Sequence, residues 1–315
     1  MADHVLVTGG LGYIGSIVCE QLLDAGYQVT AYDNLLYGGP QQGLYHLCAD
    51  PAFDFIRADV RDESSLRSAV RSADIIIHLA AIVGAPACQR DPILATSVNL
   101  DASRLLARLS SRQQLLIYPN TNSGYGSTSG DTPCTEDSPM RPISLYGQTK
   151  VEAEHVLLER ANTIAFRLAT VFGVSPRLRL DLLVNHFVYA AVKDGYLVLF
   201  EKDFKRNFVH IRDVGDCFLH AIQHADRMVG RAFNLGLDAA NISKEELALK
   251  VQQHVPNFYI HYAPIGQDPD KRNYIVSNER LRQAGFEARR SLDDGIRELI
   301  KGYRMQGLQP YRNAA

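Results

Sequence analysis

Short apolar runs alternate with stretches of helical periodicity along the first half of this 315-residue chain. Most runs are followed by a segment such as SIVCEQLLDAG or LDASRLLARLSS, in which apolar residues recur three and four positions apart. The runs lie at residues 5–8, 28–33, 53–59, 74–81, 114–120 and 163–169. Strands that alternate with helices predict an α/β fold, a doubly wound parallel sheet with helices on both faces.

The alternation breaks down after about Arg167. The remainder holds a loop-like stretch, an amphipathic segment that ends in glycine (LLVNHFVYAAVKDG), and two further strand-like runs, KRNFVHIRDV and RAFNLGL. No polar linker or repeat separates these pieces. We therefore expect a larger domain at residues 1–168, to which residues 205–237 return, and a smaller C-terminal lobe built from residues 169–204 and 238–315.

Charge and cysteine usage restrict the class of partner. Lys and Arg total 33 against 35 Asp and Glu, a net charge of −2, so no broad electrostatic field attracts nucleic acid or an anionic membrane. The chain enters a strand without a charged leader and has no apolar run of 18 residues. The five cysteines are scattered without a CxxC pair, which fits a reduced protein better than a disulfide or zinc framework. We expect a cytoplasmic protein with no metal site.

The stretch VLVTGGLGYIG places Gly9, Gly12 and Gly15 directly after the first strand and at the opening of a helix. Glycines at this spacing allow a tight turn and a close approach of backbone amides to a pyrophosphate. An ordinary strand-to-helix turn is the alternative interpretation. Asp33 ends the second strand, where its carboxylate can accept both hydroxyls of an adenosine ribose and would repel a 2′-phosphate. The pattern predicts dinucleotide binding, with NAD favoured over NADP.

The stretch RADVRD offers Asp59 and Val60 at the end of the third strand. This position suits recognition of the adenine edge of the dinucleotide. Asp59 could equally serve as the N-cap of the following helix, and the two roles are compatible.

Tyr146 and Lys150 stand four residues apart in SLYGQTKVEAEHVLLER, so both project from one face of a helix. A tyrosine has an ordinary pKa near 10. We expect the ammonium of Lys150, together with an oxidised nicotinamide, to favour the phenolate and make Tyr146 a general base. Lys150 would also hold the nicotinamide ribose. A surface pair formed by chance is the alternative.

The chain resembles, over nearly its whole length, the extended short-chain dehydrogenase/reductases that act on nucleotide sugars. The motifs TGGLGYIG, HLAA, TNSGYG, YGQTK, RNFVHIRDV and FNLG carry this resemblance. It implies NAD(P) in an N-terminal Rossmann domain, a nucleoside-diphosphate sugar between the lobes, and oxidation most often at carbon 4 with the tyrosine as base. It also implies a homodimer that pairs the helices at 99–110 and 146–160. The same motifs add to the expected cofactor site Tyr13, Ile14, Asn34, Leu79, Ala80 and Ala81.

The residues at the end of the fifth strand restrict the chemistry. By its spacing, Thr121 falls where the family carries the hydroxyl of its catalytic triad, between the tyrosine and the sugar oxygen. Asn122 and Ser123 fall where 4,6-dehydratases of this family carry an Asp-Glu pair. Dehydration needs an acid and a base, and neither an amide nor a hydroxyl supplies them at pH 7. We therefore expect dehydrogenation or epimerisation, not dehydration.

The resemblance also implies residues on the substrate side. Val83, Gly84 and Ala85 would form a wall of small residues at the junction of cofactor and sugar. Arginine suits phosphate oxygens because its planar fork can donate two hydrogen bonds. Solvated surface arginines are the alternative, and His210 is interpreted as a structural histidine. The remaining expected substrate-binding residues are Thr170, Arg177, Arg179 and Asn185 near the sugar, and Arg206 and Arg272 at the diphosphate.

Three functions remain open. The stretches YPNTNSGYG, CTEDSPMRPISLYG and DPDKRNYIVSN resemble most the subgroup of NAD-dependent GDP-D-glycero-α-D-manno-heptose 4-dehydrogenases. This resemblance implies oxidation of a GDP-heptose to a 4-keto sugar. A 4-epimerase of the UDP-glucose type needs the same Thr121, Tyr146 and Lys150. A non-catalytic dinucleotide-sensing protein is the third possibility, which an intact tyrosine and lysine disfavour.

Overall fold

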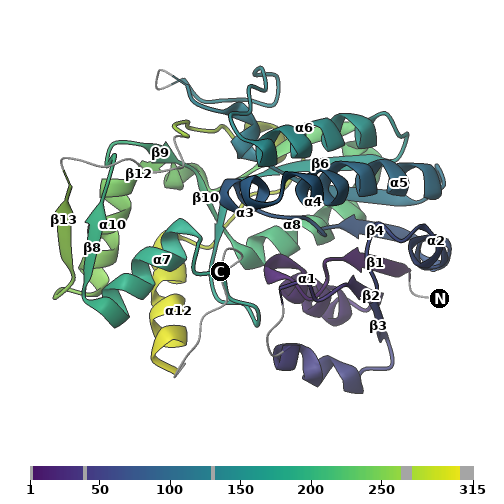
Figure 1. Cartoon of the computed structure of the whole chain (residues 1–315), viewed down its shortest axis with the longest axis horizontal. Coiled ribbons are helices and arrows are strands. Elements are labelled where there is room, and N and C mark those ends of the chain that lie inside the picture. Colours follow the sequence, from purple (N-terminus) through teal and green to yellow (C-terminus); the bar gives the residue numbers. More distant parts are fainter. Residues whose placement is uncertain (1–2, 38–40, 129–131, 264–271, 306–315) are drawn as a thin grey trace.

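Parallel strands form the centre of the computed structural model, which describes residues 3–37, 41–128, 132–263 and 272–305 (Figure 1). Within these residues the main sheet has seven strands in the order β11-β6-β5-β4-β1-β2-β3, all parallel. This confirms the predicted fold class. The strands are β1 (His4–Thr8), β2 (Gln28–Asp33), β3 (Phe53–Arg57), β4 (Ile75–His78), β5 (Leu115–Thr121), β6 (Thr163–Leu168) and β11 (Arg231–Leu235).

Helices cover both faces of this sheet. Val5 and Val7 of β1 pack with α1 and α8, whereas Leu6, between them, packs with α2, α5 and α6. The alternation follows from the two-residue period of a strand. Figure 1 shows α3 to α6 along one side of the sheet and α1 on the other. The elements of these two layers are α1 (Tyr13–Asp24), α2 (Glu63–Ser72), α3 (Ala85–Arg90), α4 (Pro92–Thr96), α5 (Ala102–Leu109), α6 (Leu145–Leu158) and α8 (Ile211–Gln223), with the short helices η1 (Gln41–Ala49), η2 (Ser97–Asp101) and η3 (Asn122–Tyr125).

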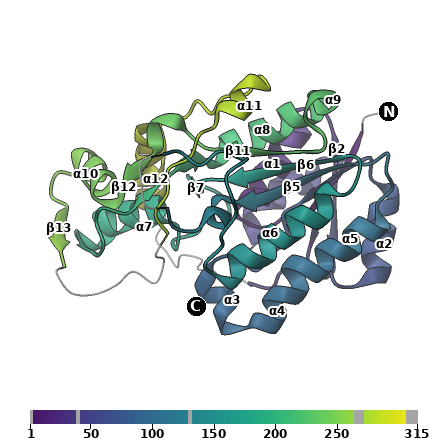
Figure 2. The same cartoon turned by 90° about the horizontal axis from the view of Figure 1, so that it is seen from above.

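A smaller group of elements extends from the carboxyl end of the sheet (Figure 2). The described strands there pair two by two, β7 with β10, β8 with β13 and β9 with β12. The predicted lobe also includes residues 264–271 and 306–315, which lie outside the described residues. The strands are β7 (Thr170–Phe172), β8 (Tyr196–Leu199), β9 (Lys205–Arg206), β10 (Phe208–His210), β12 (Ile242–Ser243) and β13 (Tyr259–Tyr262). The helices of this group are α7 (Leu183–Tyr189), η4 (Ala190–Asp194), η5 (Asp238–Ala240), α10 (Lys244–His254) and α12 (Leu292–Met305). Two short helices, α9 (Ala225–Met228) after α8 and α11 (Glu279–Gln283) against β11, lie beside the main sheet (Figure 2).

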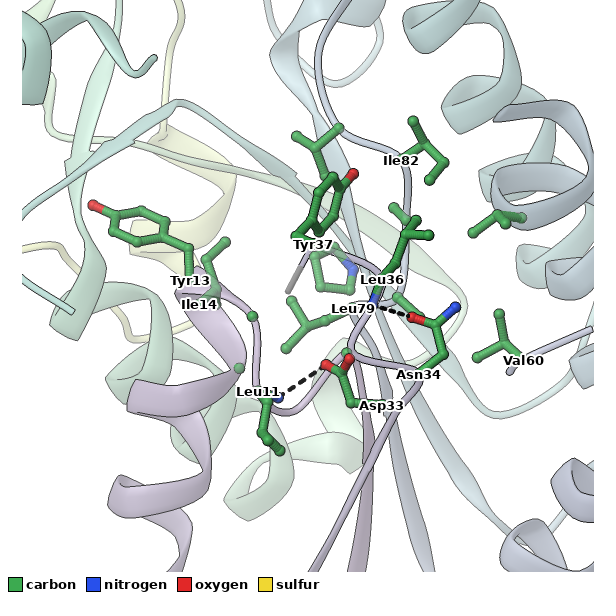
Figure 3. Close-up of a pocket in the computed structure, with 18 of the residues that line it drawn as sticks. Leu11, Tyr13, Ile14, Asp33, Asn34, Leu36, Tyr37, Val60, Leu79 and Ile82 are labelled. Carbon is green, nitrogen blue, oxygen red and sulfur yellow. Dashed lines mark hydrogen bonds between the residues drawn. The ribbon is translucent and has the colours of Figure 1, made fainter. Parts of the chain in front are cut away.

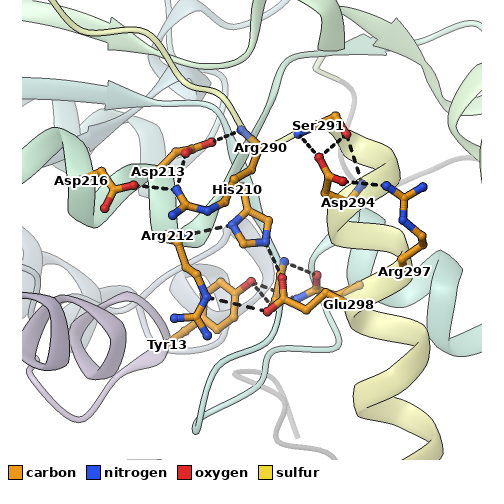
Figure 4. A network of polar contacts seen from close by, with 12 residues as sticks. Tyr13, His210, Arg212, Asp213, Asp216, Arg290, Ser291, Asp294, Arg297 and Glu298 are labelled. Carbon is orange, nitrogen blue, oxygen red and sulfur yellow. Dashed lines mark hydrogen bonds and ion pairs between the residues drawn. The ribbon is translucent and has the colours of Figure 1, made fainter.

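The chain crosses between the two groups of elements at β10. His210 ends β10 and caps α8, because its side chain accepts a hydrogen bond from the Arg212 amide at 3.2 Å. Its other ring nitrogen lies 2.6 Å from a Glu298 carboxylate oxygen on α12 (Figure 4). Arg290 adds ion pairs of 2.5 and 2.6 Å to Asp213 and Asp216 of α8. His210 therefore has a structural role, as the sequence indicated, within a polar network that joins α8 to α12.

No helix in the described part of the chain combines the length and the apolar composition that a membrane span requires.

A buried ion pair supports the helix that carries the tyrosine and the lysine. Arg167 of β6 lies 2.7 Å from Glu154 of α6, and these side chains are 8% and 1% exposed. The Asn120 amide donates to the second Glu154 oxygen at 2.5 Å, and Arg167 donates to the Tyr125 hydroxyl at 3.0 Å. The pair thus joins α6, two central strands and the segment after β5. Glu154 is one helical turn beyond Lys150. This network therefore fixes the position of α6 relative to the sheet, and with it the position of Lys150.

We predict that Glu154→Gln destabilises the protein by about 3–5 kcal/mol, because it leaves the Arg167 guanidinium buried without its counter-charge. Urea unfolding monitored by circular dichroism measures the change. Glu63→Gln is the matched control, since Glu63 pairs with Arg67 on α2 with both side chains about half exposed. That substitution should change the free energy of unfolding by less than about 1 kcal/mol. Equal effects of the two substitutions would contradict the role assigned to Glu154.

Candidate active site

The ends of several strands line one pocket, because the carboxyl ends of parallel strands meet at one edge of a sheet. Its walls come from the loops after β1, β2 and β4, the start of α6 and the segment before α7 (Figure 3). Most residues expected at the cofactor lie there. The expected residues that line it are Gly9, Gly12, Tyr13, Ile14, Gly15, Asp33, Asn34, Val60, Leu79, Ala80, Ala81, Val83, Tyr146, Lys150, Arg177 and Arg179.

The glycine loop is shaped by close contacts between backbones. Gly9 has φ +71°, and a Cβ atom there would stand 2.7 Å from the Ala80 nitrogen. A Cβ atom on Gly15 would collide with the Gly9 carbonyl oxygen. Gly12 caps α1 without a side-chain hydrogen bond, and the first turn of α1 carries no acidic residue. The α1 amides and the helix dipole are therefore suited to the diphosphate of a dinucleotide.

Asp33 lies at the end of β2, beside the glycine loop. Its carboxylate accepts a hydrogen bond from the Leu11 amide at 3.1 Å (Figure 3) and another from the Leu35 amide at 2.9 Å. Burial raises the pKa of Asp33, and these two amides oppose the rise. The carboxylate is thereby fixed next to the loop, where the hydroxyls of an adenosine ribose fit and a 2′-phosphate does not.

Asp59 departs from the expected placement. Its carboxylate binds Arg61 at 2.8 Å and accepts a hydrogen bond from the Asn34 amide at 2.9 Å. The Arg61 guanidinium lowers the pKa of Asp59 to about 2. Val60, not Asp59, is among the described residues that line the pocket. The interpretation of Asp59 as a helix cap is wrong, because the cap of α2 is Asp62, which accepts from the Ser64 amide.

Tyr146 and Lys150 both reach the pocket from the first turns of α6. The helix begins there because the Ser144 side chain accepts a hydrogen bond from the Gly147 amide at 3.2 Å. Lys150 is 4% exposed, and its ammonium stands 4.0 Å from the centre of the Tyr118 ring. Burial lowers the pKa of Lys150 to about 7, while the Glu154 carboxylate raises it. The lysine amine is thus buried against an aromatic face, and its charge is sensitive to pH near neutrality.

The electrostatics of Tyr146 differ from the sequence-based expectation. Burial raises the pKa of Tyr146 to about 12, and the charges that oppose this rise most are those of Arg179 and Arg272, not Lys150. Without the nicotinamide charge, desolvation of the phenolate outweighs a neighbouring ammonium that is itself buried. The protein's own groups therefore keep the phenol protonated at neutral pH. Oxidised NAD, when bound, adds a positive charge that favours the phenolate.

Three uncharged polar residues, Thr121, Asn122 and Ser123, stand at the end of β5, and Ser123 makes most of their hydrogen bonds. The Thr121 hydroxyl donates to the Ser123 Oγ at 2.8 Å and accepts from the Ser123 amide at 3.1 Å. Arg272 also donates to the Ser123 Oγ. The Thr121 hydroxyl faces Tyr146 closely enough to oppose the rise in the pKa of that phenol. Asn122 is fully buried, and neither atom of its amide has a partner among the described residues.

Asn185 belongs to the scaffold of the site. Its amide donates to the Tyr13 hydroxyl at 3.2 Å and to the Arg179 carbonyl at 2.9 Å. Its carbonyl oxygen accepts from the Gly173 amide at 3.1 Å, and the side chain is fully buried. This differs from the expectation that it binds substrate. Asn185 instead connects α1 to the segment that carries the two arginines.

The other expected substrate residues are spread over the lobe boundary. Arg206 is 3% exposed, donates to the Lys205 carbonyl at 2.9 Å and stands 5.8 Å from the centre of the Tyr274 ring. Thr170 begins β7 and is partly buried. Gly84 caps α3 and Ala85 begins it, so Val83 is the member of the expected small-residue wall that reaches the pocket.

The pocket also contains residues that sequence reasoning missed. Tyr37 lies in its wall after β2, and Asn120 comes from β5, one residue before Thr121. Tyr118 lies below the pocket and holds Lys150. The position of Asn120 beside Thr121 was a usable signal, because both end the same strand. Nothing in the spacing of Tyr37 or Tyr118 indicated a role.

Comparison with known proteins agrees with this geometry. Residues 5–236 match the NAD dependent epimerase/dehydratase family, which is more than half of the chain. The chain belongs to this family, and NAD is its cofactor. A probable UDP-arabinose 4-epimerase of Oryza sativa subsp. japonica is 28% identical, over 86% of this chain and 74% of its own length.

A dTDP-glucose 4,6-dehydratase of Streptomyces griseus is 26% identical, over 96% of this chain and 94% of its own length. The solved UDP-glucose 4-epimerase of Thermus thermophilus in complex with NAD superposes with a TM-score of 0.80 at 25% identity, over 96% of this chain and 99% of that chain. Epimerases and a dehydratase are thus about equally similar, so overall identity does not decide the reaction.

We predict that Asp33→Ala weakens NAD binding and narrows the preference for NAD over NADP. The ribose hydroxyls lose their acceptor, and the charge that repels a 2′-phosphate is removed. Calorimetric titration of both cofactors measures the two affinities. Asp62→Ala, which removes a carboxylate from the start of α2, is the control and should leave their ratio unchanged. An unaltered ratio for Asp33→Ala itself would reject the assignment.

Proposed function

We propose that this protein is an NAD-dependent nucleotide-sugar oxidoreductase that oxidises the carbon-4 hydroxyl of the sugar to a ketone. The observation that carries the proposal is the distribution of ionisable groups. Tyr146 and Lys150 share the pocket, and Asp33 is the one carboxylate among its described lining residues, at the adenosine end. By the family resemblance, Asn122 and Ser123 stand where a dehydration acid and base would be needed. The site thus supports proton removal and hydride transfer without elimination of water.

In this scheme Tyr146, as phenolate, takes the proton of the carbon-4 hydroxyl, directly or through the Thr121 hydroxyl. The C–H bond at carbon 4 breaks as the ketone forms, and NAD, when bound, accepts the hydride. The Thr121 hydroxyl turns from Ser123 toward Tyr146 to join this relay. Lys150, Arg179 and Arg272 stabilise the negative charge that passes from the phenolate to the sugar oxygen as the proton is transferred.

The substrate we propose is a GDP-heptose, as in the 4-dehydrogenases that the sequence most resembles. Two arginines at the lobe boundary, the buried Arg206 and the half-buried Arg272, supply cations for a nucleotide diphosphate. A thermal-shift comparison of GDP-, UDP-, ADP- and dTDP-sugars tests this part of the proposal. A larger stabilisation by any sugar nucleotide other than the GDP-linked ones would contradict it.

A 4-epimerase is the second candidate, which the similarity to the rice and Thermus epimerases favours. It would form the same ketone and return the hydride to the other face of the sugar. Product analysis separates the two: an epimer without net redox change, or a 4-keto sugar with reduced cofactor. A non-catalytic dinucleotide-binding role is disfavoured by the joint presence of Tyr146 and Lys150 in the pocket, and any turnover excludes it.

We further propose a homodimer that pairs α5 and α6 with their counterparts in a second copy. The outer face of these helices carries exposed polar residues, including Arg104, Gln148, Glu152 and His155. A dimer through this face would therefore be held by polar contacts around a small apolar centre. Scattering that shows a monomer at micromolar concentration would contradict it.

We predict that Thr121→Val reduces turnover by at least about 10²-fold, because valine keeps the shape of threonine and removes the hydroxyl of the relay. Ser123→Ala should cost less than about 10-fold, since no proton transfer is assigned to Ser123 and its loss frees the Thr121 hydroxyl to turn. Steady-state kinetics of both variants at saturating NAD measure the difference. Equal losses would show that the hydrogen bond between the two residues, not the threonine alone, is what the reaction needs.

A separate measurement tests the prediction that the protein does not dehydrate its substrate. Mass spectrometry of the product formed in deuterated water should show no loss of water. Loss of water with deuterium at carbon 5 would identify a dehydratase and overturn the assignment of the trio.

A further inference from the structure

We propose that Arg177 binds the diphosphate of NAD in the pocket that it lines together with the glycine loop. Sequence resemblance associates its segment with the sugar. The structure instead puts the guanidinium in the wall that it shares with Gly12, Tyr13 and Asp33.

The residues that surround Arg177 and Arg179 show which of these two arginines lies nearer each end of the pocket. Asp33 marks the adenosine ribose, and Tyr146 marks the nicotinamide end. Arg177 interacts electrostatically with Asp33 and Tyr37, whereas the phenol most strongly influenced by Arg179 is Tyr146. Arg177 therefore lies nearer the adenosine side and Arg179 nearer the reacting end. The diphosphate of a dinucleotide lies between its two riboses, so Arg177 stands over that part of the molecule.

A platform orients the Arg177 side chain. Its guanidinium carbon stands 4.6 Å from the centre of the Tyr37 ring, and the residue is 8% exposed. Leu35, with φ 58°, turns the chain after β2 so that Tyr37 returns to the pocket. A guanidinium stacked on a ring keeps its edge for hydrogen bonds in the plane, which suits two phosphate oxygens.

The surrounding charge also suits an anion. Arg177 and Arg179 are close enough for each charge to disfavour the other, and burial lowers the pKa of Arg177 in the same direction. In the same pocket, the α1 amides have neither a side-chain cap nor an acidic neighbour in the first turn. A diphosphate in this pocket would therefore meet two positive regions, the guanidinium and the helix N-terminus.

Calorimetry on the full chain, freed of cofactor, tests the assignment. We expect Arg177→Gln to weaken NAD and ADP-ribose binding by about 10- to 100-fold, the range for a lost charge-assisted hydrogen bond. Arg177→Lys should weaken them less, because it keeps the charge and loses the fork. Arg67→Gln, on the exposed face of α2, is the matched control and should have no effect. NAD and ADP-ribose affinities of Arg177→Gln within two-fold of wild type would overturn the proposal.

Binding of adenosine, which lacks the diphosphate, shows which part of the dinucleotide Arg177 contacts. Its affinity, measured by competition with ADP-ribose, should be the same in Arg177→Gln and wild type. A loss for adenosine as large as for ADP-ribose would assign Arg177 to the adenosine end and overturn the diphosphate assignment. If Arg177→Gln does not fold, Tyr37→Leu removes the platform and should weaken ADP-ribose binding several-fold, and no change would overturn the proposal. These readouts are binding constants, so they are independent of whether carbon 4 is oxidised.

Discussion

The approach of α1 to the ends of β1 and β4 is the contact on which the site depends. Gly9 lies against the backbone of Ala80, and Gly15 lies against Gly9, at distances that leave no room for a side chain. This packing brings the first amides of α1 to the edge of the sheet where Asp33 and Tyr146 also arrive. A larger residue at either glycine would move the helix away, and the pocket would lose its phosphate-binding wall.

A second constraint is the burial of charge beside this contact. Lys150, Arg177 and Arg179 are all less than a tenth exposed, and of the nearby carboxylates Asp181 pairs with Arg179 and Glu154 with Arg167. The same burial raises the pKa of Tyr146 to about 12. The protein alone disfavours the phenolate form of Tyr146, and it also holds several positively charged side chains close together at a cost in free energy. Bound ligands would offset both costs. A diphosphate offsets the arginines, and oxidised nicotinamide favours the phenolate.

Sequence reasoning succeeded where the relevant information is local. Gly9, Gly12 and Gly15 follow one strand, Asp33 ends another, and Tyr146 and Lys150 stand one helical turn apart, so each position follows from the geometry of a single element. It failed where two distant segments meet. Asn185 was assigned to substrate because the partners of its amide, Tyr13 and Arg179, lie on segments whose packing no local pattern encodes.

The buried pair of Glu154 and Arg167 was missed for the same reason, because its members lie on different elements and carry ordinary surface residue types. Asp59 illustrates a further limit, since two acids near the start of α2 compete for the cap and only the loop geometry selects Asp62. The effect of burial on the pKa of Tyr146 cannot be read from the spacing of Tyr146 and Lys150. Magnitudes of desolvation require the packed structure.

We propose above that a hydride passes from carbon 4 of a nucleotide sugar to NAD in this pocket. The most direct measurement uses a GDP-sugar that carries deuterium at carbon 4, in a single turnover with the NAD-bound protein. Mass spectrometry of the released cofactor should show reduced nicotinamide that contains the deuterium, formed more slowly than with the unlabelled sugar. Reduced cofactor without the label would place the oxidation at another carbon, and a labelled product formed while the cofactor stays oxidised and unlabelled at every time would contradict hydride transfer itself.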